Sequence, residues 1–198
     1  MLEQRIQQQF FDSADLKYQA AETLTRPIAA AVQAVMGCIT AGGKVLACGN
    51  GGSASDAQHF AAEFIGRFER ERPGLAAIAL TTDSSILTAV GNDYDFSQVF
   101  SKQVQALGSP GDVLLAISTS GNSANVLAAV EAAHAKDMTV IALTGRGGGK
   151  MGALLTDTDV HICVPHERTA RIQEVHILAI HCICDAVDLQ LLGEQDNA

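Results

Sequence analysis

The chain has 198 residues, of which 47% are hydrophobic and 18% charged, with four prolines and no tryptophan. This composition excludes a disordered or collagen-like protein and is typical of a compact domain with a substantial core. The formal net charge of −9 argues against a protein that binds the nucleic-acid backbone, which requires clustered lysine and arginine. It is compatible with binding a phosphorylated metabolite, because phosphate sites use backbone amides.

The N-terminus and the cysteines indicate where the protein works. The first ten residues lack the apolar core of a signal peptide. No apolar run approaches the ~18 residues that a bilayer-spanning helix needs. The five cysteines are odd in number and scattered, without a CxxC pair, which favours buried, reduced thiols over disulfides. We therefore expect a soluble, cytoplasmic protein that binds neither membrane nor nucleic acid.

Two amphipathic helices are predicted ahead of the first strand. One covers residues 2–23. The second follows Pro27, since proline suits the first turn of a helix, and ends at Gly42-Gly43. Two helices are more than one strand needs for cover. We interpret residues 1–42 as a helical element that packs against other subunits, with cover of the chain's own core as the alternative.

Beyond residue 43 an apolar run, a polar or glycine-rich turn and a helical stretch recur in turn. This alternation predicts an α/β core over residues 43–198, with a parallel sheet flanked by helices on both faces. Ligands bind at the carboxyl ends of the strands in such folds. The expected strands are Val45–Cys48, Ala76–Leu80, Val113–Ile117, Thr139–Leu143 and Val160–Val164.

A glycine-rich turn, Gly49-Asn-Gly-Gly-Ser53, follows the first strand and opens a helix. The glycines allow an oxygen-rich ligand to approach the backbone closely. His59 and Glu63 lie one turn apart on the same helix face. Ser53 with Asp56 also fits a capping box, so part of this pattern could be only a helix start.

The third strand ends in Ser118-Thr-Ser-Gly-Asn-Ser123, which leads into a helix over residues 124–135. Free amides, the helix dipole and several hydroxyls make a phosphate site without a basic side chain. No GK[ST] follows, which disfavours nucleotide hydrolysis. A polar turn with an ordinary cap is the alternative.

Three other segments have plainer interpretations. Residues 144–149 are expected to form a flexible connector, and residues 69–73 a solvated face, with Arg67 able to reach an anionic ligand. A last long helix, residues 168–192, is largely apolar but carries Gln173, His176 and His181. Burying such groups costs free energy unless they are paired or bind a metal.

These motifs together resemble one known family. Gly49–Ser53 with Gln58–Glu63, Gly91–Asp93, Gly111–Ser123 and Arg171–His181 closely resemble the phosphoheptose isomerases, of the sugar-isomerase (SIS) fold group, over nearly the whole chain. The resemblance implies a single SIS domain with a five-stranded parallel sheet and a homotetramer with sites between subunits. It also implies conversion of D-sedoheptulose 7-phosphate to D-glycero-D-manno-heptose 7-phosphate, the first step of ADP-heptose supply for the lipopolysaccharide core.

The resemblance also assigns roles to individual residues. It implies one zinc ion per subunit, held by His59, Glu63, Gln173 and His181. The substrate contacts that it implies are Asn50, Gly51, Gly52, Asn92, Asp93, Ser118, Thr119, Ser120, Ser123 and Gln173.

Gln173 and His181 constrain how one ion could be held. They are eight residues apart, about 12 Å along a straight helix. They share one ion only if it lies between them or if subunits exchange residues.

The chemistry of aldose–ketose isomerisation needs one basic and one acidic group, because a proton leaves one carbon and returns to its neighbour. We assign Glu63 as the base and His181 as the acid that serves the sugar oxygens. A metal with nitrogen and oxygen ligands could polarise the carbonyl. Zinc would weaken Glu63 as a base, so zinc is partly structural or Glu63 changes its coordination during turnover.

Two rival functions share the fold. The chain is also similar to the DnaA initiator-associating protein, a tetrameric regulator of replication that binds a protein partner. A sugar-phosphate sensor would keep the phosphate loop but comes with a DNA-binding segment, which is not visible here. Neither rival needs an acid–base pair, so Glu63 and His181 favour the enzyme.

Overall fold

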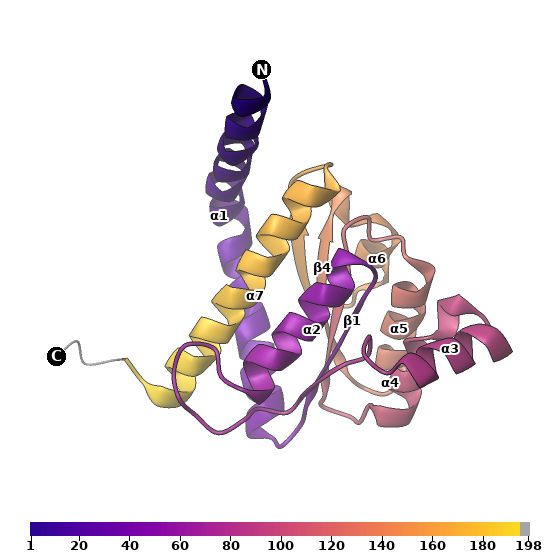
Figure 1. Ribbon diagram of the computed structural model, residues 1–198. Helices are drawn as coiled ribbons and strands as arrows, with labels where there is room; N and C mark the ends of the chain where they lie inside the picture. The colour runs from indigo at the N-terminus through magenta and orange to yellow at the C-terminus, as the bar shows by residue number, and fades with distance from the viewer. Residues whose placement is uncertain (195–198) are drawn as a thin grey trace.

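The computed structural model describes residues 1–194 and has one five-stranded parallel sheet at its centre (Figure 1). The strand order is β2-β1-β3-β4-β5, and every neighbouring pair is parallel. The strands are β1 (Val45–Gly49), β2 (Ala77–Ala79), β3 (Val113–Ser118), β4 (Thr139–Gly145) and β5 (Val160–Val164). All five predicted strands are confirmed, with bounds that differ by at most two residues.

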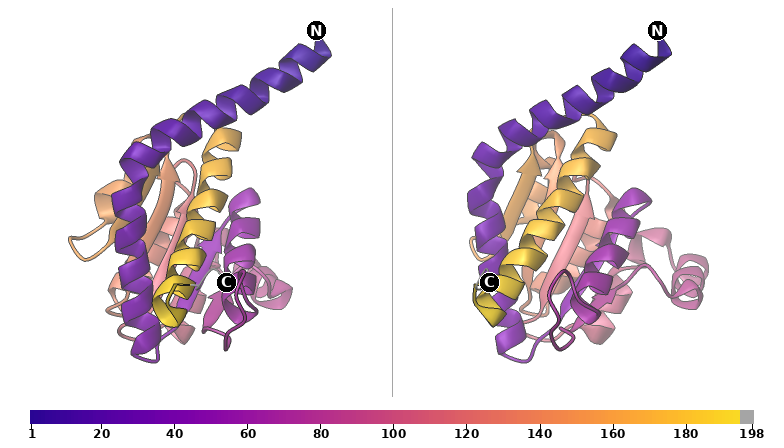
Figure 2. Two further views of the ribbon diagram at one scale, coloured as in Figure 1. Left: turned by 90° about the vertical axis from the view of Figure 1, so that its left-hand side faces the viewer. Right: turned by 60° about the vertical axis from the view of Figure 1, so that its left-hand side comes forward.

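Helices cover the sheet on both faces, as the alternating pattern predicted. One layer holds α1 (Leu2–Thr40), α2 (Gly52–Ile65) and α7 (Thr169–Leu192) (Figures 1 and 2). The other holds α3 (Ser84–Asp93), α4 (Ser101–Leu107), α5 (Ala124–His134) and α6 (Gly149–Leu154). Short 3₁₀ turns, η1 (Phe96–Gln98) and η2 (Arg146–Gly148), precede α4 and α6.

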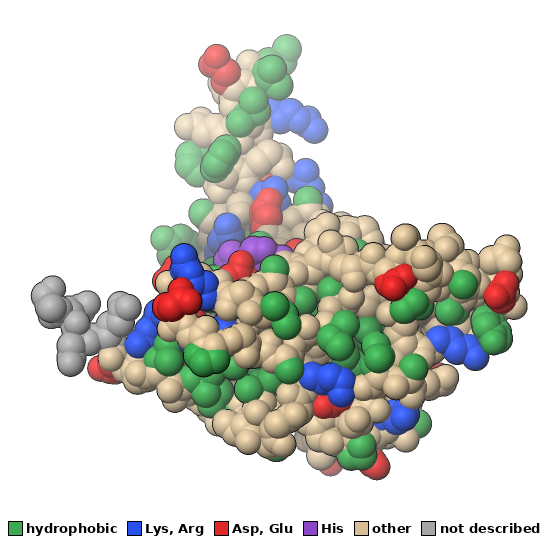
Figure 3. All heavy atoms as spheres, turned by 60° about the horizontal axis from the view of Figure 1, so that its bottom comes forward, with side chains coloured by type: hydrophobic (Ala, Val, Ile, Leu, Met, Phe, Trp, Pro, Cys, Tyr) green, Lys and Arg blue, Asp and Glu red, His purple; other side chains and the backbone are tan. Residues whose placement is uncertain are grey.

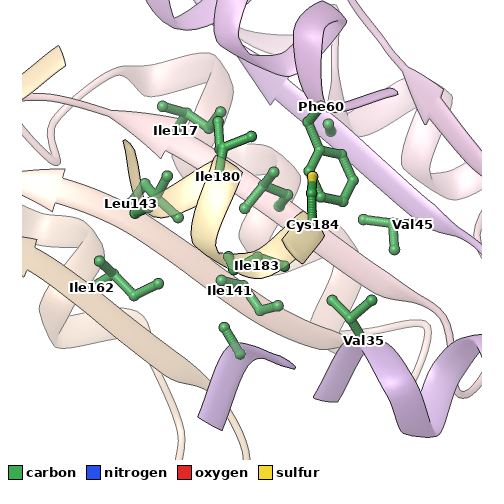
Figure 4. Close-up of a cluster of buried hydrophobic side chains, with 14 of the residues drawn as sticks. Val35, Val45, Phe60, Ile117, Ile141, Leu143, Ile162, Ile180, Ile183 and Cys184 are labelled. Carbon is green, nitrogen blue, oxygen red and sulfur yellow. The ribbon is translucent and has the colours of Figure 1, made fainter. Parts of the chain in front are cut away.

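The core divides into two clusters because successive strand side chains point to opposite faces. Val113, Leu115 and Ile117 pack beneath α1, α2 and α7, whereas Leu114 and Ala116 pack beneath the other layer. Figure 4 shows the first cluster, in which Phe60 of α2 and Ile180 of α7 meet the strands. Burial on both faces explains why the central strands β1 and β3 are apolar runs rather than alternating with polar residues.

The N-terminal element is one helix, not two. α1 runs unbroken from Leu2 to Thr40 with Pro27 inside it, so the predicted break is wrong. Proline removes one helical hydrogen bond and bends a helix without always ending it, and Figure 2 shows that α1 changes direction along its length. Leu24 and Val32, on either side of Pro27, are both buried, so packing on the core holds the helix together.

Helix α7 is long and apolar enough, by length and composition, to cross a membrane. In the fold it is instead a core helix that packs against α1, α2 and β4. Its two cysteines lie on different sides, with Cys184 buried and Cys182 exposed. Burial, with the nearby charges of Glu63 and Asp188, raises the pKa of Cys184 to about 12, so this thiol stays protonated.

In the segment after α2, Glu69, Glu71 and Pro73 are exposed, as predicted for a solvated face, but the prediction is wrong for Arg72. Arg72 is buried, and its Nε donates to Asp188 Oδ1 of α7 over 2.5 Å. Its other nitrogens donate to the carbonyl oxygens of Glu63 and Phe64, each over 2.9 Å. This arginine therefore joins the C-terminal end of α2 to α7.

We predict that Arg72→Ala lowers the free energy of unfolding by about 3–5 kcal/mol, because it leaves the Asp188 carboxylate buried without its partner. Arg70→Ala is the matched control. Arg70 is a half-buried neighbour whose guanidinium donates to Gly193 O, and its loss should cost less than about 1 kcal/mol. Urea denaturation followed by circular dichroism measures both, and equal losses would contradict the role given to the buried pair.

Candidate active site

The predicted acid and base meet a third residue where α2 packs beside α7. His59 Nε2 lies 2.9 Å from His181 Nε2 and 3.4 Å from Glu63 Oε1. His59 and Glu63 are brought together by their spacing along α2, and His181 faces them from α7. The His59 side chain is 39% exposed and that of Glu63 is 20% exposed, so the cluster borders solvent and a ligand can reach it.

Contact between the two imidazoles restricts the tautomers of both rings. One ring nitrogen must donate and the other must accept across the 2.9 Å contact. Phe68 also packs against the ring of His181, with 5.5 Å between ring centroids. The orientation of His181 is therefore fixed from two sides.

The donor atoms of this cluster are two imidazole nitrogens and a carboxylate oxygen, a set that suits zinc. The two nitrogens are in hydrogen-bond contact, and among residues 1–194 no group of three or more His, Cys, Asp or Glu side chains is already arranged around a metal position. The residue types thus fit zinc, while their side chains would have to turn to face one ion.

Gln173, the fourth ligand that the family resemblance implied, lies elsewhere on the same helix pair. A Cβ atom at Gly52 would lie 2.9 Å from the Gln173 Cδ, so this glycine is needed for the amide to pack against the start of α2. Gln173 therefore lies beside the glycine-rich turn, whereas His181, about two helical turns further along α7, lies beside His59.

The glycine-rich turn differs in one respect from the prediction. The N-cap of α2 is Gly51, with φ of 57°, and no side chain caps the helix, so the capping box of Ser53 and Asp56 is wrong. Asp56 instead lies in the second turn, on the same face as His59. Burial raises its pKa to about 6, against the opposing effect of His59. Its spacing from His59 was the one indication of this half-buried carboxyl in the sequence.

The hydroxyl-rich segment has the geometry of an anion site. Ser118 Oγ and Ser123 Oγ are 2.9 Å apart, so the segment curls back on itself. Ser123 is the N-cap of α5, but its side chain makes no cap hydrogen bond. The first amides of α5 and the hydroxyls therefore converge at the positive end of the helix dipole. Thr119 and Ser120, both half-buried, lie in the same curl.

Residues 144–149, predicted to be a flexible connector, support this curl instead. The Gly145 amide donates to Thr119 O over 3.1 Å, and the Met151 amide donates to Gly121 O over 2.9 Å. Gly121 has φ of 63°, and a Cβ atom there would collide with Gly148 O. The whole segment belongs to β4, η2 and the start of α6, so the prediction of a flexible loop is wrong.

Asn92 and Asp93 are not brought to the other predicted residues. They are exposed at the end of α3, where Asn92 Nδ2 donates to Asp93 Oδ1 over 2.9 Å. Leu87 and Val90 of α3 pack with the cluster on the opposite face of the sheet from α2 and α7. Within one subunit these two residues are separate from Glu63 and His181.

Asn125 was not among the site residues predicted from the sequence. Its side chain is buried and forms two hydrogen bonds with Asn50, each 2.8 Å long. The position of Asn125, two residues after Ser123, was the one available indication.

Comparison with known proteins agrees with the motifs and the fold. Residues 9–145 match the model of the SIS domain family. The phosphoheptose isomerase of Methylibium petroleiphilum is 86% identical over 196 residues, which make up 99% of this chain and 98% of that protein.

Two solved structures are similar over nearly the whole chain. The phosphoheptose isomerase from Neisseria gonorrhoeae is 59% identical, with a TM-score of 0.91, over 95% of this chain and 99% of that chain. The one from Francisella tularensis is 48% identical, with a TM-score of 0.92, over 95% of this chain and 98% of that chain. The chain therefore belongs to the SIS domain family and, within it, to the phosphoheptose isomerases.

Proposed function

We propose that the protein converts D-sedoheptulose 7-phosphate to D-glycero-D-manno-heptose 7-phosphate, the first step of ADP-heptose supply for lipopolysaccharide core. The observation that carries the proposal is the contact of Glu63 and His181 with the same nitrogen of His59, at 3.4 and 2.9 Å. An acid and a base held together have no use in a protein that only binds a partner. The high identity to phosphoheptose isomerases also favours the enzyme over the DnaA-binding regulator.

In this proposal the phosphate is held by the hydroxyls and amides of the curl that begins at Ser118, and Asn50, Gly51 and Gly52 hold the sugar. Glu63 removes the proton beside the ketose carbonyl and returns it to the neighbouring carbon, while His181 exchanges a proton with the sugar oxygens. Each positioned group contributes ~10²–10⁴-fold to the rate. The proposed substrate contacts are Asn50, Gly51, Gly52, Asn92, Asp93, Ser118, Thr119, Ser120, Ser123 and Gln173.

We further propose that the site is shared between subunits of a homotetramer. Gly52 and Glu63 are eleven residues apart on α2, about 16 Å along its axis. The proton-transfer pair thus lies at the far end of α2 from the glycine-rich turn, and Asn92 and Asp93 lie on the opposite face of the sheet. A neighbouring subunit that supplies some of these residues would bring them within reach of one substrate.

The exposed part of α1 supports assembly. Its burial against the chain's own core begins at Leu16, whereas Phe10 and Tyr18 are 72% and 78% exposed. Figure 3 shows hydrophobic side chains on the segment that projects from the body. We propose one SIS domain over residues 1–198, in which residues 1–42 form the helical packing element and 43–198 the α/β core, working in the cytoplasm.

Zinc would be held by His59, Glu63, Gln173 and His181, one ion per subunit. Gln173 would join the other three ligands either through a shift of α2 against α7 or from another subunit. A bound zinc ion would polarise the substrate carbonyl.

Glu63→Gln should lower kcat by about 10²–10⁴-fold while the fold is kept, because the amide is nearly the same shape but cannot take the proton. A coupled assay for the aldoheptose 7-phosphate measures this. Glu131→Gln, an exposed glutamate on α5, is the control and should keep full activity. Zinc-loaded wild-type protein that forms no isomer, with Glu63→Gln still binding a protein partner as wild type does, would instead support the regulator.

Protein purified without added zinc should carry about one zinc ion per subunit by elemental analysis, and His59→Ala should carry far less. His134→Ala is the matched control, because His134 lies in α5 and pairs with Asp159, away from the contact between α2 and α7. A chelator should abolish activity and added zinc restore it. Metal-free protein whose activity resists the chelator would remove zinc from the proposal.

The double variant Ile6→Asp, Phe10→Asp should dissociate the tetramer, because it places charges on the exposed apolar face of α1. Light scattering after gel filtration measures the mass. Gln4→Asp with Gln7→Asp adds the same charge to the same part of the helix and should leave the tetramer intact. Equal masses for wild type and the first variant would refute the role of α1.

A further inference from the structure

A reciprocal amide pair joins the two loops of the proposed site. Asn50 Nδ2 donates to Asn125 Oδ1, and Asn125 Nδ2 donates to Asn50 Oδ1, each over 2.8 Å. Asn50 lies in the glycine-rich turn after β1, and Asn125 is the second residue of α5, just after the phosphate curl. Among the hydrogen bonds of residues 1–194, these two alone connect residues 50–52 with residues 118–125.

The sheet places the two loops side by side, but it does not fix their spacing beyond the strand ends. β1 and β3 are paired up to Gly49 and Ile117, after which each chain leaves the ladder. The amide pair begins one residue beyond that last pairing on the β1 side. It therefore continues the connection between β1 and β3 into the loops, where backbone pairing has ended.

Burial makes the pair geometrically demanding. Asn125 is 3% exposed, so losing a partner would leave a buried polar group without a hydrogen bond. The reciprocal arrangement uses one donor and one acceptor of each amide and fixes which way each faces. The Asn50 side chain is thereby committed to Asn125, which leaves its backbone and that of Gly51 and Gly52 to face a ligand.

We propose that Asn125 is a positioning residue for the isomerisation. It sets the distance between the loop that holds the phosphate and the loop that holds the sugar, without touching the substrate itself. A sugar phosphate spans both loops and depends on their spacing, whereas inorganic phosphate occupies the curl alone. This inference rests on the proposed function for the identity of the sugar phosphate.

The test compares two ligands on Asn125→Ala by isothermal titration calorimetry. The dissociation constant of sedoheptulose 7-phosphate should rise about tenfold or more, while that of inorganic phosphate changes less than about twofold. The double variant with Asn50→Ala should bind the sugar phosphate no worse than the weaker single variant, because both changes break the same pair. If Asn125→Ala does not fold, Asn125→Ser is judged by the same criteria.

Gln103→Ala is the matched control. Gln103 is also a buried amide with two hydrogen bonds, to Leu80 O and Val99 O, but it lies in α4 away from both loops. It should lower stability and leave both dissociation constants unchanged. Equal weakening of both ligands by Asn125→Ala, unchanged binding, or additive losses in the double variant would overturn the inference. Wild-type protein that binds the sugar phosphate without isomerising it would refute the proposed function alone.

Discussion

The parallel pairing of β1 with β3 is the constraint on which the site depends. It sends two separate loops out of the same edge of the sheet, one rich in glycine and the other in hydroxyl groups. The backbone amides of the paired strands are used in the ladder. The amides of the loops beyond the strand ends remain available for a ligand. The N-termini of α2 and α5 follow directly, and both direct partial positive charge toward that edge. A protein with a net charge of −9 can thus attract an anion locally.

The packing of α2 on α7 arranges the rest. Gly52 lies against Gln173, and His59 contacts His181. The second contact comes seven residues after the first along α2 and eight residues after it along α7. The two helices therefore run in the same direction, and contacts repeat about every two turns. Arg72 and Asp188 tie the helices together at their far end. Arg72 therefore stabilises the fold and also positions the proposed base, because its guanidinium donates to the carbonyl oxygen of Glu63.

Much of this architecture could be predicted from the sequence. The central strands β1 and β3 are apolar runs that stop at glycine or serine, since strands buried on both faces have few polar positions. The types of the site residues could also be predicted, because Ser118–Ser123 and the pair His59 and Glu63 are local patterns. Local spacing alone places each of them on its loop or helix.

The remaining features depend on partners that are distant in sequence. Arg72 is buried because of Asp188, 116 residues away, and Asn125 meets Asn50 across 75 residues. Pro27 stays inside α1 because packing on both sides outweighs its cost. Asn92 and Asp93 lie apart from Glu63 and His181 because α3 covers the opposite face of the sheet from α2 and α7.

The close approach of Gly121 to Gly148 O has a consequence for how the proposed phosphate would be held. Two stretches of backbone meet there without intervening side chains, and hydrogen bonds from Gly145 and Met151 hold them together. A binding loop fixed in this way has little conformational entropy left to lose when a ligand arrives, unlike a cluster of long lysine and arginine side chains. Recognition by a rigid frame of backbone also ties affinity to shape. A side chain added at either glycine would therefore alter the frame itself, even though neither glycine offers a functional group to the ligand.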